Sequence, residues 1–328
     1  MIRGRVTMIC RALSPIHHGA EVVGNVSTFR KHDVYVDGSA YSVPFISGNS
    51  VKSANRRASA QFAVTAMELE GTMTRAEVAL LRSGGAMTKS GPVVRLDKAR
   101  DASRSMPVLG LHGFAAGNAM QESMVSVDIL EPLCWETREK YRREVEAYMT
   151  TADHWALEEP ASEFLRTYSE YARDGSRDRG GFKLMTPDDA KALADQLAKA
   201  EDKDPYRPMP HSFECLKPGT ILVGGWTFAK GITDEEMQAW RAGVTFACEG
   251  VAADGGLLMR LGGKTARGFG KVSVHLFGEL ARGIEAPQFL STPELVPGAF
   301  PDDALREFGQ SLAATKDDAQ RAMREVSS

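Results

Sequence analysis

The sequence has no apolar run of about 20 residues, the length that a membrane-spanning helix needs. Residues 1–13 alternate apolar and polar side chains and lack the continuous apolar core of a secretory signal peptide. The 328 residues are 43% hydrophobic and 25% charged, as is usual for globular proteins, and suffice for one large or two small domains. We therefore expect a cytoplasmic protein with no membrane partner.

Closely spaced cysteines are also missing. The four cysteines are Cys10, Cys134, Cys215 and Cys248, and no two lie within four residues of each other. This spacing excludes CxxC-type zinc and redox sites and predicts reduced, mostly buried thiols. No metal site and no other cofactor are expected.

An overall excess of positive charge, typical of nucleic-acid-binding proteins, is absent too, since the net charge is −3. The charge is nevertheless segregated along the chain. Two segments are basic: residues 1–60 carry eight Lys/Arg and three Asp/Glu, and residues 260–282 carry five Lys/Arg and one Asp/Glu. Residues 131–204 are acidic, with twelve Lys/Arg and eighteen Asp/Glu. Either the two basic segments share one face of the molecule or the segregation is a chance fluctuation.

Hydrophobic periodicity predicts an alternation of strands and helices. Strands are expected at 2–13, 213–228 and 271–277, with a hairpin that turns at Asp37-Gly38. Helices are expected at 48–67 (capped by Ser50), 74–82 (capped by Thr74), 233–254 (capped by Thr233, with Glu236 three residues on) and 302–326. Residues 83–105 are expected to be exposed and mobile, and 135–204 to be helical.

This order predicts an α+β protein with a split βαβ, ferredoxin-like core. The expected core spans 1–134 and 205–296, including a loop and hairpin at 14–47. Residues 135–204 would be a helical insertion, and 297–328 a C-terminal helical tail.

The segment GGKT at 262–265 looks like the end of an ATP-binding P-loop. That motif requires a glycine where this chain has Leu258, and a helix directly after the loop. Here Gly268, Gly270 and an alternating strand follow, so the P-loop is rejected. A glycine-rich turn remains, with Lys264, Arg267 and Lys271 projecting from it. The turn either binds an anion or is structural, with solvated cations.

A second glycine-and-cation element is PFISGNSVKSANRR, at 44–57. It places Lys52, Arg56 and Arg57 in the first turns of an expected helix. Lys52 and Arg56 are four residues apart on one helix face, where a bound anion would relieve their repulsion. Two such elements favour a polyanion such as an RNA backbone.

Three segments, in order, resemble motifs of the RAMP superfamily of CRISPR effector proteins. PFISGNSVKSANRR is similar to the family's P-x-I-P-G-S-S-L-K-G-x-L-R helix start, and GGKTARGFGKV (262–272) resembles its GG-x-x-x-x-GFG-x-V loop. LGLHGFAAG (109–117) is similar to the turn between them, although His112 interrupts the pattern. The layout resembles the backbone subunit, the seventh Cas family, in its type IV version.

The resemblance implies an RNA-recognition-motif-like palm (βαββαβ) with a thumb, and copies that assemble along a CRISPR guide RNA. The implied partners are that guide RNA, a target nucleic acid expected to be DNA, further copies of the chain and other effector subunits. Phosphate and sugar contacts would hold the RNA without regard to sequence. The RNA-binding residues that we expect are His17, His18, Asn49, Ser50, Lys52, Arg56, Arg57, Gly262, Gly263, Lys264, Thr265 and Arg267.

Catalysis is not expected. Type III relatives cut RNA with an aspartate after the first strand, and Ser27 stands at the corresponding position here. A serine is a poorer metal ligand and no base without an activating partner. His17 and His18, as strand neighbours, would point to opposite faces, which disfavours a shared metal ion. Phe29, Tyr35 and Tyr41 either stack on bases or pack the hairpin.

Three hypotheses follow. The leading one is a non-catalytic subunit that binds guide RNA and oligomerises along it. The alternatives are a guide-processing endoribonuclease that uses His17 or His18 as a base, and a globular protein with purely structural glycine loops.

Overall fold

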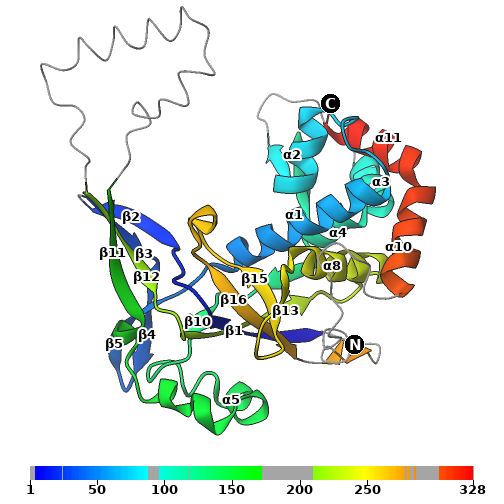
Figure 1. The fold of residues 1–328 in the computed structure, drawn as a ribbon. Coiled ribbons are helices and arrows are strands. Elements are labelled where there is room, and N and C mark those ends of the chain that lie inside the picture. The colour runs from blue at the N-terminus through cyan, green and yellow to red at the C-terminus, as the bar shows by residue number, and fades with distance from the viewer. Residues whose placement is uncertain are drawn as a thin grey trace, which may run out of the picture.

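The computed structural model describes residues 4–23, 25–87, 96–117, 119–171, 210–277, 279–280, 284–285 and 303–327. The described chain is α+β, as predicted. A central sheet runs through the middle of the molecule, most helices gather beside it, and a second β region extends on the other side (Figure 1).

The central sheet has the strand order β10-β13-β1-β16-β15-β14, with β9 also paired to β13. Neighbouring strands are antiparallel throughout. Val6, Met8 and Cys10 of β1 are buried, as their alternation predicted. The strands are β1 (Arg5–Ala12), β9 (Val125–Val127), β10 (Glu131–Pro132), β13 (Ile221–Phe228), β14 (Gly250–Val251), β15 (Leu257–Arg260) and β16 (Lys271–Phe277).

Helices α1 (Gly48–Ala66) and α8 (Asp234–Ala247) pack tightly against each other. Asn55 donates from Nδ2 to the carbonyl of Trp240, and a Cβ on Gly243 would collide with Asn55. The expected capping box of Thr233 and Glu236 is present at the start of α8. The helix ends at Ala247, earlier than predicted, and the chain then forms β14.

The remaining helices are α2 (Arg75–Ser83), capped by Thr74 as predicted, α3 (Leu96–Ser105), α4 (Pro107–His112), α10 (Asp303–Ala314) and α11 (Lys316–Ser327). Helix α3 corrects the expectation of an exposed, mobile loop at 83–105 for residues 96–105, where Ala99 and Ala102 are buried; residues 88–95 lie outside the described residues. The predicted helix 302–326 is two helices that meet at Thr315. A small sheet joins β6 (Gly85–Met87), β7 (Phe114–Gly117) and β8 (Ala119–Gln121).

The second β region contains a four-stranded sheet in the order β11-β12-β3-β2. Its strands are β2 (Gly19–Val23), β3 (Val26–Phe29), β11 (Leu165–Tyr171) and β12 (Pro210–Leu216). Strand β11 contradicts the helix expected there, because it pairs along its whole length with β12. Of the predicted helical insertion, the structure describes α5 (Arg142–Tyr148) and two short 3-10 helices (Thr151–Leu157 and Ala161–Phe164). Its two clearest helical patterns are 137–149, which contains α5, and 188–203, which lies outside the described residues.

The predicted hairpin is present as β4 (Lys31–Val36) and β5 (Ser39–Pro44). Asp37 and Gly38 have φ values of 49° and 81°, as a two-residue primed turn requires. A last short pair joins β17 (Glu279–Leu280) and β18 (Ile284–Glu285).

The four cysteines are buried and free, as expected. Over the part of the chain that the structure describes, no helix is long and apolar enough to cross a membrane. The same residues contain no group of three or more His, Cys, Asp or Glu side chains that could hold a metal ion.

Candidate nucleic-acid interface

The two glycine-and-cation elements are joined by the dipeptide His17-His18. The backbone N–H of Gly263 donates to the carbonyl of His17, 2.7 Å away. The Nε2 atom of His18 accepts from the backbone N–H of Ser47, 3.2 Å away. The 262–268 loop and the first turn of α1, more than 200 residues apart in sequence, therefore lie on either side of the same dipeptide.

Ser47, and not Ser50, caps α1. Its side chain accepts from the backbone N–H of Ser50 at 3.3 Å. Asn49 is exposed and Ser50 is half-buried. A Cβ on Gly48 would lie 2.1 Å from the carbonyl oxygen of Val127, so this glycine is needed for packing against β9.

The three cations of α1 have different environments. Lys52 is half-buried, and burial together with the charge of Arg56 lowers the pKa of its ammonium group. Within the described residues, Lys52 has no hydrogen bond or ion pair. Arg57 is exposed and donates only to the Ser53 hydroxyl, at 3.3 Å. Lys52 and Arg57 can therefore meet an anion from outside.

Arg56 is a correction to the predicted site. It is only 8% exposed, and burial lowers its pKa to about 10. Its guanidinium donates to the carbonyls of Leu81 (2.9 Å) and Leu80 (3.1 Å) in the last turn of α2. A cation at a helix C-terminus interacts favourably with the last carbonyls and with the negative end of the helix dipole. Arg56 thus fastens α2 to α1 and does not face solvent.

The 262–268 loop is not a P-loop, as the sequence predicted. Only a short 3-10 turn, Thr265–Arg267, precedes β16. Gly262 has φ of 79°, and a Cβ there would lie 2.3 Å from the carbonyl oxygen of His17, so it serves packing. Gly263 is exposed, and a Cβ added there would lie at ordinary contact distance from His17.

Two cations extend from this loop. Lys264 has left-handed backbone (φ 59°), and its Nζ lies 4.0 Å from the ring centroid of Phe213, a cation–π contact. Phe213 also packs against the rings of His17, Tyr168 and Phe269. Arg267 is exposed, and Thr265 is half-buried. Sequence reasoning did not single out Phe213, which no motif marks.

The two histidines diverge, as expected for strand neighbours. The Nδ1 atom of His17 lies 3.0 Å from the carbonyl oxygen of Glu214, and its ring meets Phe213 edge-on. His18 turns toward Ser47 and Phe29. Burial, with smaller contributions from Arg30 and His17, lowers the pKa of His18 to about 4. His18 is therefore a neutral hydrogen-bond acceptor that fixes the start of α1.

The three aromatic residues near the hairpin also separate. Phe29 is buried, and Tyr41 packs edge-on against Trp135 at 5.3 Å. Tyr35 is 72% exposed near the hairpin tip. Ser27 is 9% exposed.

No model of a known protein family matches the sequence, and no curated protein matches it. Solved structures do match. A chain described as "Type IV-B CRISPR Complex" superposes with a TM-score of 0.53 and 17% identity, over 92% of this chain and 96% of that chain. The protein shares the fold of that CRISPR-complex chain. The resemblance drawn from the three motifs is thus confirmed at the level of the fold.

A second solved structure, "Crystal structure of Thermofilum pendens Csc2", has a TM-score of 0.38 and 14% identity, over 99% of this chain and 86% of that chain. This similarity is too low to support an argument.

Proposed function

We propose that this protein is a non-catalytic backbone subunit of a CRISPR effector complex, and that it binds guide RNA at the joined surface described above. The observation that carries the proposal is the junction at His17-His18, which brings two separate glycine-and-cation elements together. Copies would assemble along the RNA in the cytoplasm, with other effector subunits and a target nucleic acid, expected to be DNA, as partners.

The strand order supports the finer fold assignment. In the order β10-β13-β1-β16, α1 follows β1 and α8 follows β13, and all neighbouring strands are antiparallel. This order supports the proposal of a split βαβ, ferredoxin-like palm. The hairpin β4–β5 and the β11–β12 region would supply the thumb.

The proposed RNA-contacting set is smaller than the one expected from sequence. It omits Arg56, His18 and Gly262, whose donors, acceptor or backbone already serve the fold. It keeps His17, Asn49, Ser50, Lys52, Arg57, Gly263, Lys264, Thr265 and Arg267. To contact RNA, the ammonium group of Lys264 would either leave the Phe213 ring or bind the RNA from its place over that ring.

One observation favours the alternative, a guide-processing endoribonuclease. Because a carbonyl can only accept, the Nδ1 atom of neutral His17 carries the proton toward Glu214, and Nε2 keeps its lone pair. A ring held in this way is available as a general base. Cleavage of a CRISPR-repeat RNA in EDTA, abolished by His17→Ala, would establish this second function.

The test of the leading proposal is RNA binding by the triple variant Lys52→Gln, Arg57→Gln, Arg267→Gln. The matched control neutralises three exposed arginines elsewhere, Arg142, Arg143 and Arg166. Each lost phosphate contact should reduce the slope of log affinity against log salt by about 0.7. We expect a reduction of about 2 in the triple variant and little change in the control.

Assembly is measured separately. The wild-type chain, co-expressed with a CRISPR array and washed in high salt, should purify as a large particle whose 260/280 nm absorbance ratio shows nucleic acid. A monomer free of RNA, or equal salt slopes in the two triple variants, would contradict the proposal.

A further inference from the structure

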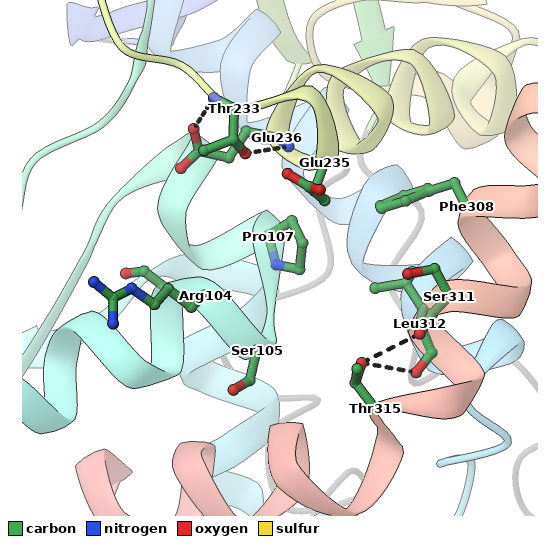
Figure 2. Close-up of a pocket in the computed structure, with 11 residues that line it drawn as sticks. Arg104, Ser105, Pro107, Thr233, Glu235, Glu236, Phe308, Ser311, Leu312 and Thr315 are labelled. Atoms are coloured by element: carbon green, nitrogen blue, oxygen red, sulfur yellow. Dashed lines mark hydrogen bonds between the residues drawn. The ribbon is translucent and has the colours of Figure 1, made fainter.

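A pocket of about 390 Å³ lies in the helical part of the molecule, away from the candidate RNA surface. This volume is within the range of about 300–1,000 Å³ that is usual for ligand sites. Ends of α3, α4, α8 and α10 surround it (Figure 2). Its lining residues are Ser103, Arg104, Ser105, Pro107, Thr233, Glu235, Glu236, Phe308, Ser311, Leu312 and Thr315.

The pocket lies near the opposite end of α1 from the RNA surface. Phe308 in its wall stacks on Phe62 of α1, with ring centroids 5.7 Å apart. Ser47 caps α1 fifteen residues before Phe62, which corresponds to about 22 Å along the helix. Figure 1 likewise shows α10 on the far side of the molecule from the loop between β15 and β16.

Glu235 supplies the charge of the pocket. Its carboxylate is directed into the space between Pro107 and Phe308 (Figure 2). Among the described residues, this carboxylate has no hydrogen bond or ion pair. The one basic lining residue, Arg104, directs its guanidinium away from that space and lies 4.0 Å from Asp101. Glu235 is exposed and lies in the first turn of α8, so its charge is offset by solvent and by the positive end of that helix dipole and is open to a cationic partner.

Two helix ends add to the negative potential. Helix α3 ends at Ser105 and α10 ends at Ala314, so both direct carbonyl ends toward the pocket. The N-terminus of α8 has the opposite polarity, and there Glu236 of the capping box accepts from the backbone N–H of Thr233 at 2.9 Å. Hydroxyl groups of Ser105, Ser311 and Thr315 provide further acceptors at the rim.

The walls suit the stem of a long cationic side chain. Phe308 and Leu312 are buried apolar residues, and Pro107 presents a ring without an N–H donor. Lysine and arginine bury an aliphatic stem against apolar surface and keep the charged end on polar groups. The pocket thus combines an apolar wall with one exposed, unpaired carboxylate at its edge.

We propose that this pocket receives an arginine or lysine side chain from a neighbouring protein subunit, with Glu235 as the residue that pairs with its charge. The inference rests on the proposed function only in that assembly supplies the neighbouring subunit. The pocket would then be a protein–protein contact separate from the RNA surface.

The test uses the full chain without RNA, so that a failure of the RNA proposal does not affect it. The probe is N-acetyl-arginine amide, titrated against protein with labelled Leu and Thr methyl groups. The expected result is a saturable shift of the Leu312 and Thr315 methyl signals. Glu235→Gln should weaken binding about tenfold, while Glu307→Gln, which removes an exposed acid elsewhere on α10, should leave it unchanged.

Two further probes set the alternatives apart. N-acetyl-citrulline amide, which is nearly the same shape without the charge, should give no shift at the two methyl groups. Putrescine, a free diamine, should bind more weakly than the arginine amide; tighter binding would show a small-molecule amine site and overturn the subunit contact. The absence of any shift with the arginine amide, or a shift insensitive to Glu235→Gln, would overturn the proposal entirely.

Discussion

The Nε2 atom of His18 accepts a hydrogen bond from the backbone N–H of Ser47, the residue that caps α1. Only a neutral imidazole with Nε2 unprotonated can do this. The first turn of α1 thereby depends on a titratable side chain, the imidazole of His18. The residue before it, His17, accepts a hydrogen bond from Gly263 of the 262–268 loop. Protonation of His18 would remove the acceptor and add a charge beside Arg30 and His17.

This dependence predicts that stability falls in mild acid. Because the pKa of His18 is lowered from 6.5 to about 4 in the folded state, its stabilising contribution is complete above pH 6.5 and is lost progressively as the pH falls toward 4. The loss is at most about 3 kcal/mol, and less where water screens the half-buried ring.

The measurement compares urea unfolding of wild type and His18→Gln between pH 7.5 and pH 4.5. Glutamine can accept the same hydrogen bond but does not titrate, so the carboxylates contribute equally to both curves. The free energy of unfolding of the wild type should decline more steeply with falling pH. Parallel curves would show that His18 does not couple α1 to pH.

A second prediction distinguishes the two adjacent glycines of the loop. Gly262→Ala places a Cβ at left-handed φ and 2.3 Å from the carbonyl oxygen of His17, so it should destabilise the fold by about 1–3 kcal/mol. Gly263→Ala meets its nearest neighbour at 3.6 Å and should change stability by less than about 0.5 kcal/mol.

RNA affinity should respond in the opposite order. The methyl group in Gly263→Ala covers exposed backbone that a phosphate would approach, so affinity should fall several-fold in a stably folded protein. Thermal unfolding and fluorescence anisotropy with single-stranded RNA provide both readouts. If Gly263→Ala binds RNA as tightly as wild type, the backbone of this loop does not contact RNA.

A third prediction concerns the neighbouring arginines of α1. Arg56→Gln removes two buried, charge-assisted hydrogen bonds to the end of α2 and should cost about 2–4 kcal/mol of stability. Arg56→Lys should also lower the free energy of unfolding, since lysine lacks the planar fork that reaches two carbonyls. Arg57→Gln should leave the free energy of unfolding within about 0.5 kcal/mol and lower RNA affinity instead. Urea unfolding and RNA titration measure the two effects. If Arg56→Gln lowered only RNA affinity and Arg57→Gln lowered only stability, the structural role would belong to Arg57 and the RNA contact to Arg56.

Elements whose cause is local could be predicted from sequence. The capping box of Thr233 and Glu236 and the hairpin turn at Asp37-Gly38 depend on residues within three or four positions, and both are present. Strand β11 could not be predicted in this way, because its partner β12 begins 39 residues after it ends. Its apolar residues Leu165, Tyr168 and Tyr171 are three positions apart, a spacing that does not show the period-2 alternation of a strand.

The candidate site was predictable in its motifs and not in its contacts. Spacing puts Lys52 and Arg56 on one face of α1, yet only the packing of α2 shows that Arg56 is turned inward. Similarly, nothing in the loop sequence places Lys264 over Phe213 of β12. Long cationic side chains reach several partners from one backbone position, so their roles depend on neighbours that are distant in sequence.

The last prediction concerns Tyr35, which is 72% exposed and pairs with Ala40 across the hairpin. An aromatic ring held in solvent on a two-stranded ribbon contributes little to folding and offers a face on which a base can stack. Tyr35→Ala should therefore cost about 1–3 kcal/mol of RNA binding and less than about 0.5 kcal/mol of stability. Tyr35→Phe keeps the ring and should retain most of the affinity.

Tyr41→Ala is the matched control: it loses the contact with Trp135 and should destabilise the hairpin. Equal RNA affinities for wild type and Tyr35→Ala, measured by anisotropy on the same oligonucleotide, would show that Tyr35 does not add to the RNA-binding surface.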